Sequence, residues 1–295
     1  MKAPEPPEPR RYCGRDFTAA DLAHIRQLLD RKPPLNRVQL SRRICQDLGW
    51  LNPLGHPKEM SCRVALLRLQ KDGLIQLPKP LTKNGNGRVR PMLTAAWEPR
   101  GAVRQPVRAL EPLQFQTVQS PAASRLWNEL MQRHHYLGYG PLSGAQMRYL
   151  IWSEDGQLLA ALGFGASAWQ IKPRDQYIGW DDRQRRLGLH RVVNNARFLI
   201  LPWVRSPGLA SRILSGMIKP LLSDWVLHYG HRPLLLESFV ESPRFAGTSY
   251  QAANWICVGQ TQGRGKLEKQ HRQACPVKQI WLYPLDPLFR KILCP

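Results

Sequence analysis

The chain of 295 residues carries 43 lysines and arginines against 21 aspartates and glutamates, a formal net charge of +22. This length accommodates two domains and at least one sizeable core, and the charge favours a polyanionic partner, with DNA as the first choice. No apolar run approaches the roughly 20 residues of a membrane span, and residues 1–11 are charged and proline-rich, unlike a secretory leader. We therefore expect a cytoplasmic protein with no membrane partner.

The six cysteines indicate free thiols and not a metal centre. They form no CxxC pair and show no Cys/His spacing of the kind that holds zinc. The sequence therefore predicts no metal site.

The N-terminal part is typical of a small helical domain. After a tail at residues 1–15, which we expect to be disordered, Thr18 and Asn36 can each cap a helix, and Pro57 can begin a third. Apolar residues recur at helical spacing behind each of these signals. We place this domain at residues 16–95.

The third of these helices is followed by a short apolar run at residues 74–78 and a glycine-rich tip at residues 84–90. Three helices, a strand and a basic hairpin are the order of a winged helix-turn-helix. Arginine and lysine on the third helix and on the wing can contact base edges and phosphates in DNA. The predicted DNA contacts are Lys58, Arg63 and Arg68 on the helix and Arg88 and Arg90 on the wing. The alternative is a small helical domain with solvated arginines.

A linker at residues 96–112 leads to a second domain at residues 113–295. Within it, residues 147–152 and 158–164 are predicted strands, because the pair Asp155–Gly156 between them is a strong hairpin signal. The overall fold class is therefore α+β.

Two further segments of this domain are candidates for the site or its surroundings. A helix over residues 124–132 precedes His135, which could act as a general base or could be structural. The polar residues 170–191 resemble a loop inserted over the site.

A glycine turn follows the apolar run at residues 197–204, which reads as a strand, and precedes a helical stretch at residues 211–222. Small residues at such a turn let backbone N–H groups and the helix N-terminus approach a diphosphate. Pro207 counts against this site, because proline removes one N–H donor. The predicted cofactor-binding residues are Arg205, Gly208, Leu209, Ala210 and Ser211.

The next elements complete a recognisable order. The apolar run at residues 234–236 leads through Glu237 to a short helical segment with Tyr250, and Asn254 and Trp255 end it. Strand, glycine turn, helix, strand and tyrosine-bearing helix resemble the acyl-CoA-binding half of the GNAT N-acetyltransferase fold. That resemblance implies Glu237 as the base for an attacking amine and Tyr250 as the acid for the departing thiolate. Both residues could equally be structural.

A closer resemblance covers nearly the whole chain. Five segments carry it: residues 134–138, 194–200, 237–240, 247–255 and 259–265. They are similar to the DruA family, which is associated with Druantia anti-phage defence and with mobile elements. Ser249 stands where a cysteine is expected in many relatives, which argues against a catalytic thiol.

The resemblance implies a nucleic-acid context but leaves the reaction open. One hypothesis is an acyltransferase that modifies DNA or a DNA-associated amine with acyl-CoA, the one candidate cofactor. A second is DNA strand breakage and joining, with Tyr250 as nucleophile and no acyl-CoA. Its charge-stabilising residues would be His135, Arg197, Arg264 and Lys266. A third is a non-catalytic DNA-binding subunit. Other defence-system or mobile-element proteins are expected partners.

Overall fold

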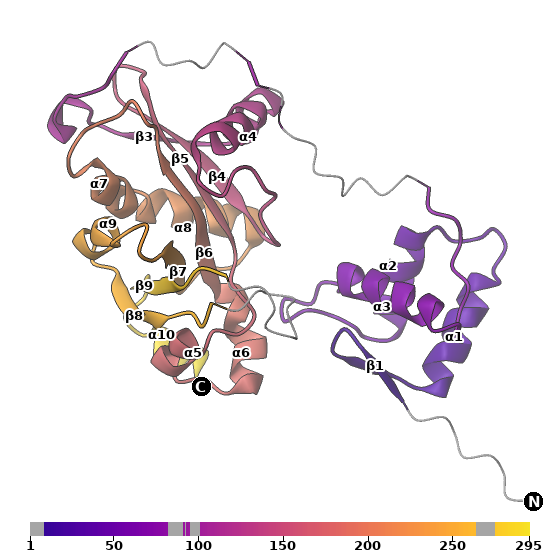
Figure 1. Ribbon diagram of the computed structural model, residues 1–295. Coiled ribbons are helices and arrows are strands. Elements are labelled where there is room, and N and C mark those ends of the chain that lie inside the picture. The colour runs from indigo at the N-terminus through magenta and orange to yellow at the C-terminus, as the bar shows by residue number, and fades with distance from the viewer. Residues whose placement is uncertain (1–8, 82–90, 92, 95–100, 264–274) are drawn as a thin grey trace, which may run out of the picture. The chain divides into compact units, whose positions relative to one another are not determined.

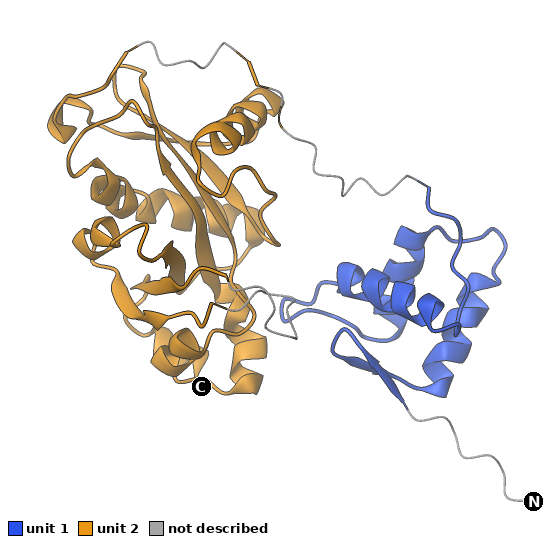
Figure 2. Cartoon of the chain, in the orientation of Figure 1, with its two compact units in different colours: residues 1–87 blue, residues 88–295 orange. Residues whose placement is uncertain are grey.

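A computed structural model describes residues 9–81, 91, 93–94, 101–263 and 275–295. The chain separates into two compact units, residues 1–87 and 88–295 (Figure 2). Each unit has its own hydrophobic core. No helix in the described part of the chain is both long and apolar enough to cross a membrane.

Unit 1 begins with a hairpin of β1 (Arg10–Tyr12) and β2 (Arg15–Phe17). The expectation of a disordered tail through residue 15 is therefore wrong from Arg10 onward. Cys13 and Gly14 at the turn both have positive φ, 51° and 82°. Two such residues match the right-handed twist of paired strands, so the chain can reverse within two residues.

Three helices follow: α1 (Ala19–Leu29), α2 (Arg37–Asp47) and α3 (Glu59–Lys71). Thr18 and Asn36 cap α1 and α2 with complete capping boxes, as the sequence predicts. The expected strand at residues 74–78 is absent, because this described segment pairs with no other strand. The predicted wing, with Arg88 and Arg90, lies outside the described residues, so the winged helix stays a prediction.

Unit 2 is built on a seven-stranded mixed sheet in the order β3-β4-β5-β6-β7-β9-β8. All neighbours are antiparallel except β6 and β7, which are parallel. The strands are β3 (Gln114–Thr117), β4 (Met147–Trp152), β5 (Leu158–Ala166), β6 (Val192–Ile200), β7 (Leu235–Glu241), β8 (Ile256–Gln260) and β9 (Lys278–Pro284).

Helices cover both faces of this sheet (Figure 1). Side chains alternate along β4: Arg148 bonds to Ser124 on α4, whereas Tyr149 bonds to Asp224 on α8. The helices are α4 (Pro121–His134), α5 (Lys172–Ile178), α6 (Asp182–Gly188), α7 (Leu209–Gly216), α8 (Ile218–Tyr229), α9 (Thr248–Ala252) and α10 (Phe289–Leu293), with short 3-10 turns at Val107–Ala109 and Leu189–Arg191.

Two sequence expectations differ from this structure. Residues 170–191 contain α5 and α6 and are not an irregular loop. The helical stretch at residues 211–222 is two helices that meet at Met217.

The pairing around β6 creates the main opening in unit 2. Only three positions of β6, Val192 to Asn194, pair with β7 before the two strands separate. On its other edge β6 carries a bulge, because Gly163 and Phe164 of β5 pair with Arg197 and Asn195 and leave Ala196 unmatched. A parallel pair that separates within an otherwise antiparallel sheet agrees with the expected GNAT-like arrangement.

Candidate functional site

A cavity of about 770 Å³ occupies the space where β6 and β7 separate. Residues 194–200 of β6 and residues 238–240 of β7 line it. Residues 134–137 at the end of α4, residues 244–250 from the connection after β7 into α9, Ala210 and Lys278 line it as well. This volume lies within the range of ligand-binding pockets.

Three cationic side chains line this cavity: Arg197, Arg244 and Lys278. No aspartate or glutamate occurs among the described residues that line it. Arg244 lies 3.9 Å from the Glu241 carboxylate at the rim, and its side chain is 55% exposed. The cavity therefore has a positive lining that favours an anionic ligand.

Arg197 directly follows the bulge residue Ala196. Its Nη1 donates to the Ala196 carbonyl oxygen at 2.7 Å, while its Nε is buried without a hydrogen-bond partner. Burial lowers the pKa of this guanidinium from its ordinary value. Because an arginine stays charged in proteins, an anion in the cavity would supply the missing partner.

Tyr250 on α9 is buried at the cavity wall. Its hydroxyl donates to Asn195 Oδ1 at 2.8 Å and accepts from Ser238 Oγ at 2.9 Å. Burial raises the pKa of Tyr250 well above its ordinary value. The phenol is therefore protonated at neutral pH, which suits a proton donor better than a nucleophile.

His135 also lines the cavity and is only 9% exposed. Burial, with Arg197 and Lys278 nearby, lowers its pKa to about 4. The Leu137 N–H donates to His135 Nδ1 at 3.2 Å, so the proton of the neutral ring belongs on Nε2. In this state His135 offers a hydrogen-bond donor and not a base.

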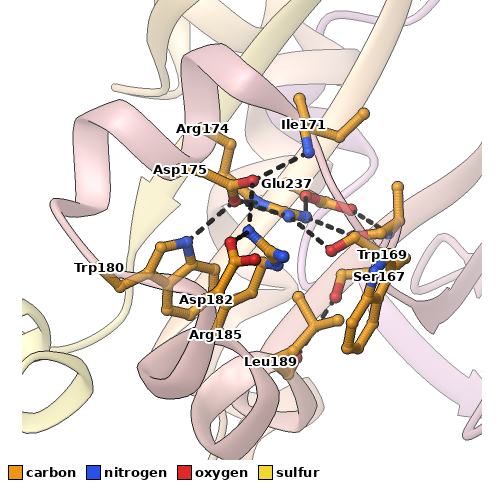
Figure 3. Close-up of polar contacts among 11 residues, drawn as sticks. Ser167, Trp169, Ile171, Arg174, Asp175, Trp180, Asp182, Arg185, Leu189 and Glu237 are labelled. Atoms are coloured by element: carbon orange, nitrogen blue, oxygen red, sulfur yellow. Dashed lines mark hydrogen bonds and ion pairs between the residues drawn. The ribbon is translucent and has the colours of Figure 1, made fainter. Parts of the chain in front are cut away.

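Glu237 does not line the cavity, whereas its neighbour Ser238 does. Successive side chains of β7 point to opposite faces of the sheet, so Glu237 lies on the face away from Tyr250. It is fully buried and pairs with Arg174 on α5, whose Nη1 lies 2.8 Å from Glu237 Oε2 (Figure 3). The Ala168 N–H donates to the other carboxylate oxygen at 2.9 Å. Arg174 also donates from Nε and Nη2 to Asp175 Oδ1. This arrangement fastens α5 to β7 and leaves Glu237 no free oxygen for a substrate amine.

Of the five predicted cofactor residues, only Ala210 lines the cavity. Gly208 adopts φ +82° before α7, and the Arg205 N–H donates to the Val103 carbonyl at 2.8 Å. Ser206 Oγ in the same turn is buried without a partner. The small residues and this orphaned hydroxyl fit a diphosphate beside the cavity, although Pro207 supplies no N–H.

The predicted DNA contacts on α3 differ from one another. Lys58 and Arg68 are exposed, whereas Arg63 is half-buried and bonds to Ser41 and Glu59. Arg88, Arg90, Arg264 and Lys266 lie outside the described residues. Among the predicted nucleic-acid residues that the structure describes, Arg197 alone lines the cavity. Within the described ranges no group of three or more His, Cys, Asp or Glu side chains could hold a metal ion.

Sequence reasoning did not single out several cavity residues, among them Asn195, Ser238, Arg244 and Lys278. Asn195 and Ser238 could have been predicted, because both belong to segments that carry the family resemblance. Lys278 reaches the site through strand pairing, since it faces Glu241 across β7 and β9. No local pattern marks that pairing.

The strand order and the opening between β6 and β7 define the class of unit 2 as a GNAT-like mixed-sheet domain. The particular family follows from the sequence: the profile described as Druantia protein DruA matches residues 68–280. The chain belongs to the DruA family, which takes its name from the Druantia anti-phage defence system. No curated protein matches the chain.

Solved structures with a similar fold include spermidine N-acetyltransferases from Vibrio cholerae. One, in complex with CoA and spermine, has a TM-score of 0.39 and 10% identity over 59% of this chain and 95% of its own. A second, in complex with manganese ions, has a TM-score of 0.38 and 10% identity over 59% of this chain and 92% of its own.

Proposed function

We propose that this DruA-family chain is a DNA-binding protein of anti-phage defence or of a mobile element, and that the cavity of unit 2 binds a phosphate-bearing ligand. The carrying observation is the set of three cations in a lining whose described residues include no carboxylate, with Arg197 Nε unpartnered. A charged donor left unpaired is costly, so a bound anion would stabilise this arrangement. The net charge of +22 supports the same class of partner.

A salt titration tests this proposal. Binding that neutralises phosphates releases counterions, so log K falls linearly with log salt, with a slope of about −0.9 per phosphate for duplexes and about −0.7 for single strands. Fluorescence anisotropy should show such a slope for labelled oligonucleotides of both kinds. An affinity that stays flat as salt increases would overturn the proposal.

Acyl transfer is the second candidate, and a specific observation favours it: protonated Tyr250 and Ala210 of the glycine turn line one cavity. Acyl-CoA would supply the activated acyl group, with its diphosphate near Ser206, Gly208 and Ala210. Tyr250 would then give its proton to the departing sulfur, and the proton lost by the attacking nitrogen would restore the phenol, so that amine and thioester become amide and thiol. Glu237 cannot serve as the base while Arg174 occupies it, so the amine would have to arrive uncharged.

Strand breakage by Tyr250 is less well supported. Its hydroxyl is hydrogen-bonded to Asn195 and Ser238, and the raised pKa disfavours the phenolate that a nucleophile requires. A non-catalytic DNA-binding subunit would need neither a nucleophile nor acyl-CoA.

One experiment separates these three roles. Purified protein and Tyr250→Phe are incubated with DNA, with and without acyl-CoA, and adducts are sought by mass spectrometry. A Tyr250-dependent protein–DNA adduct without acyl-CoA would establish strand breakage. A mass increase of the DNA only with acyl-CoA would establish acyl transfer. Neither change, with DNA binding retained, would leave the binding role alone.

A further inference from the structure

The rim of the cavity combines two aromatic rings with an arginine. Tyr136 and Phe245 meet edge to face, with ring centroids 5.3 Å apart. The Arg244 guanidinium carbon lies 5.0 Å from the Tyr136 ring centre and 6.0 Å from that of Phe245. These residues come from two segments, one after α4 and one between β7 and α9.

Phe245 is 45% exposed although it is fully apolar. Burial in a core would give such a ring far more stabilisation, so its position at the mouth of a cationic cavity suits a ligand with a flat face. Nucleic-acid bases have such a face, and they stack on aromatic rings and on guanidinium planes.

The cations are placed to complement such a base. Arg197 lies on β6 and Lys278 at the start of β9, and both line the same cavity as the aromatic rim. A nucleotide joins a flat base to a phosphate through a sugar, so one ligand can satisfy both groups of side chains. A cavity of about 770 Å³ is large enough for it.

We propose that the cavity takes one nucleotide of a single-stranded nucleic acid, with its base against Tyr136, Phe245 and Arg244 and its phosphate at Arg197 and Lys278. This inference rests on the proposed function and names the ligand of that same site. A strand is favoured over CoA because its phosphate would meet the cations that line the cavity, whereas the turn that would hold the CoA diphosphate lies mostly outside the lining. The nucleotide part that both ligands share makes CoA the competitor to include.

A base analogue gives a local readout. 2-Aminopurine loses fluorescence when it stacks, so a short single strand with one such base should be quenched by the full-length protein. Phe245→Ala should abolish the quenching and weaken binding roughly five- to 150-fold, the range for loss of one stacked base. Leu227→Ala is the matched control, because Leu227 is 87% exposed on α8 and lies outside the cavity.

A second variant tests the phosphate contact. Arg197→Gln should reduce the salt slope for the single strand by about 0.7, the value for one phosphate contact. Arg186→Gln, at an exposed position on α6, should leave the slope unchanged. Circular dichroism of each variant excludes a loss of folding.

The outcomes separate this inference from the proposed function. If no DNA binds in a salt-dependent way, the proposed function fails. If DNA binds but 2-aminopurine is not quenched and Phe245→Ala binds like the parent protein, only the single-strand inference is overturned. If CoA binds in a Phe245-dependent way and the single strand does not, the cavity takes CoA and the inference is again overturned.

Discussion

Single residues of unit 2 separate structural roles from ligand-binding ones. Glu237 was predicted as a base from its place at the end of a strand, but its carboxylate holds Arg174, and neither side chain is accessible to solvent. A charge left unpaired in such surroundings is far more costly than one at the surface. We therefore assign Glu237 to the attachment of α5.

Glu237→Gln should destabilise unit 2 by about 1–3 kcal/mol, because Arg174 would keep its buried charge and lose one of its two anionic partners, with Asp175 as the remaining one. Urea unfolding measures this change. Glu111→Gln, which breaks the pair with Arg212 at a position 30% exposed, should cost at most about 1 kcal/mol. Equal losses for the two variants would contradict the structural role.

His135 should make stability depend on pH. Its pKa is about 4 in the folded chain against an ordinary 6.5, so between these values the unfolded chain binds more protons. Stability should therefore fall as pH decreases from 6.5 towards 4 and should be unaffected by this group above that window.

His135→Gln should make this loss shallower in urea midpoints measured across the same window. Burial also lowers the pKa of His190 to about 4, so part of the loss should persist in that variant. An unchanged profile in His135→Gln would show that the ring is not held neutral by the fold.

Among the elements, α9 depends on the turn that precedes it. Gly247 has φ +79°, and a Cβ there would lie 2.5 Å from Cζ2 of Trp281. Gly230, at the end of α8, has φ +69° and no atom within 4 Å of such a Cβ. The two glycines share a backbone conformation and differ in the space around them.

Gly230→Ala should cost about 1–2 kcal/mol from the left-handed backbone alone. Gly247→Ala should cost about 1–3 kcal/mol more, because Trp281 must also move. Chemical denaturation of both variants gives the difference. Similar costs would mean that Trp281 yields freely and that α9 is not fixed by this contact.

The elements also show how far the sequence predicts the fold. The hairpin of β4 and β5 was predicted from Asp155–Gly156 and is confirmed, since turn chemistry is local. The helices α5 and α6 were missed because Arg174 and Arg185 face inward and are paired with carboxylates, so no apolar stripe marks them.

The cavity was only partly predictable for a related reason. Tyr250 and Arg197 lie in motifs that the sequence displays, so both were recognised as candidates. Lys278 joins them through the pairing of β7 and β9, whose register brings Glu241 opposite Lys278, and Arg244 lies in the connection that follows β7. Such long-range pairing has no signature within a short segment.

At the scale of the whole molecule, added salt should act on the free protein and on the proposed DNA complex in opposite directions, because the net charge is +22. Salt screens the repulsion among like charges and also weakens contacts to phosphates. Raising NaCl from about 50 to about 300 mM should increase the thermal midpoint of the free protein and decrease its affinity for DNA. Calorimetry and anisotropy measure the two trends. A midpoint that falls with salt would show that attractive pairs outweigh the excess charge.

The short pairing between β6 and β7 should make the stiffness of the sheet depend on a bound ligand. Three paired positions connect one part of the sheet, strands β3–β6, with the other part, strands β7–β9. Beyond these positions β6 and β7 separate. A ligand that binds both Arg197 on β6 and Lys278 on β9 would link the two parts of the sheet across the cavity. Occupancy of the cavity and stiffness of the sheet should then rise together, and slower amide exchange in β6 and β7 on ligand addition would report it.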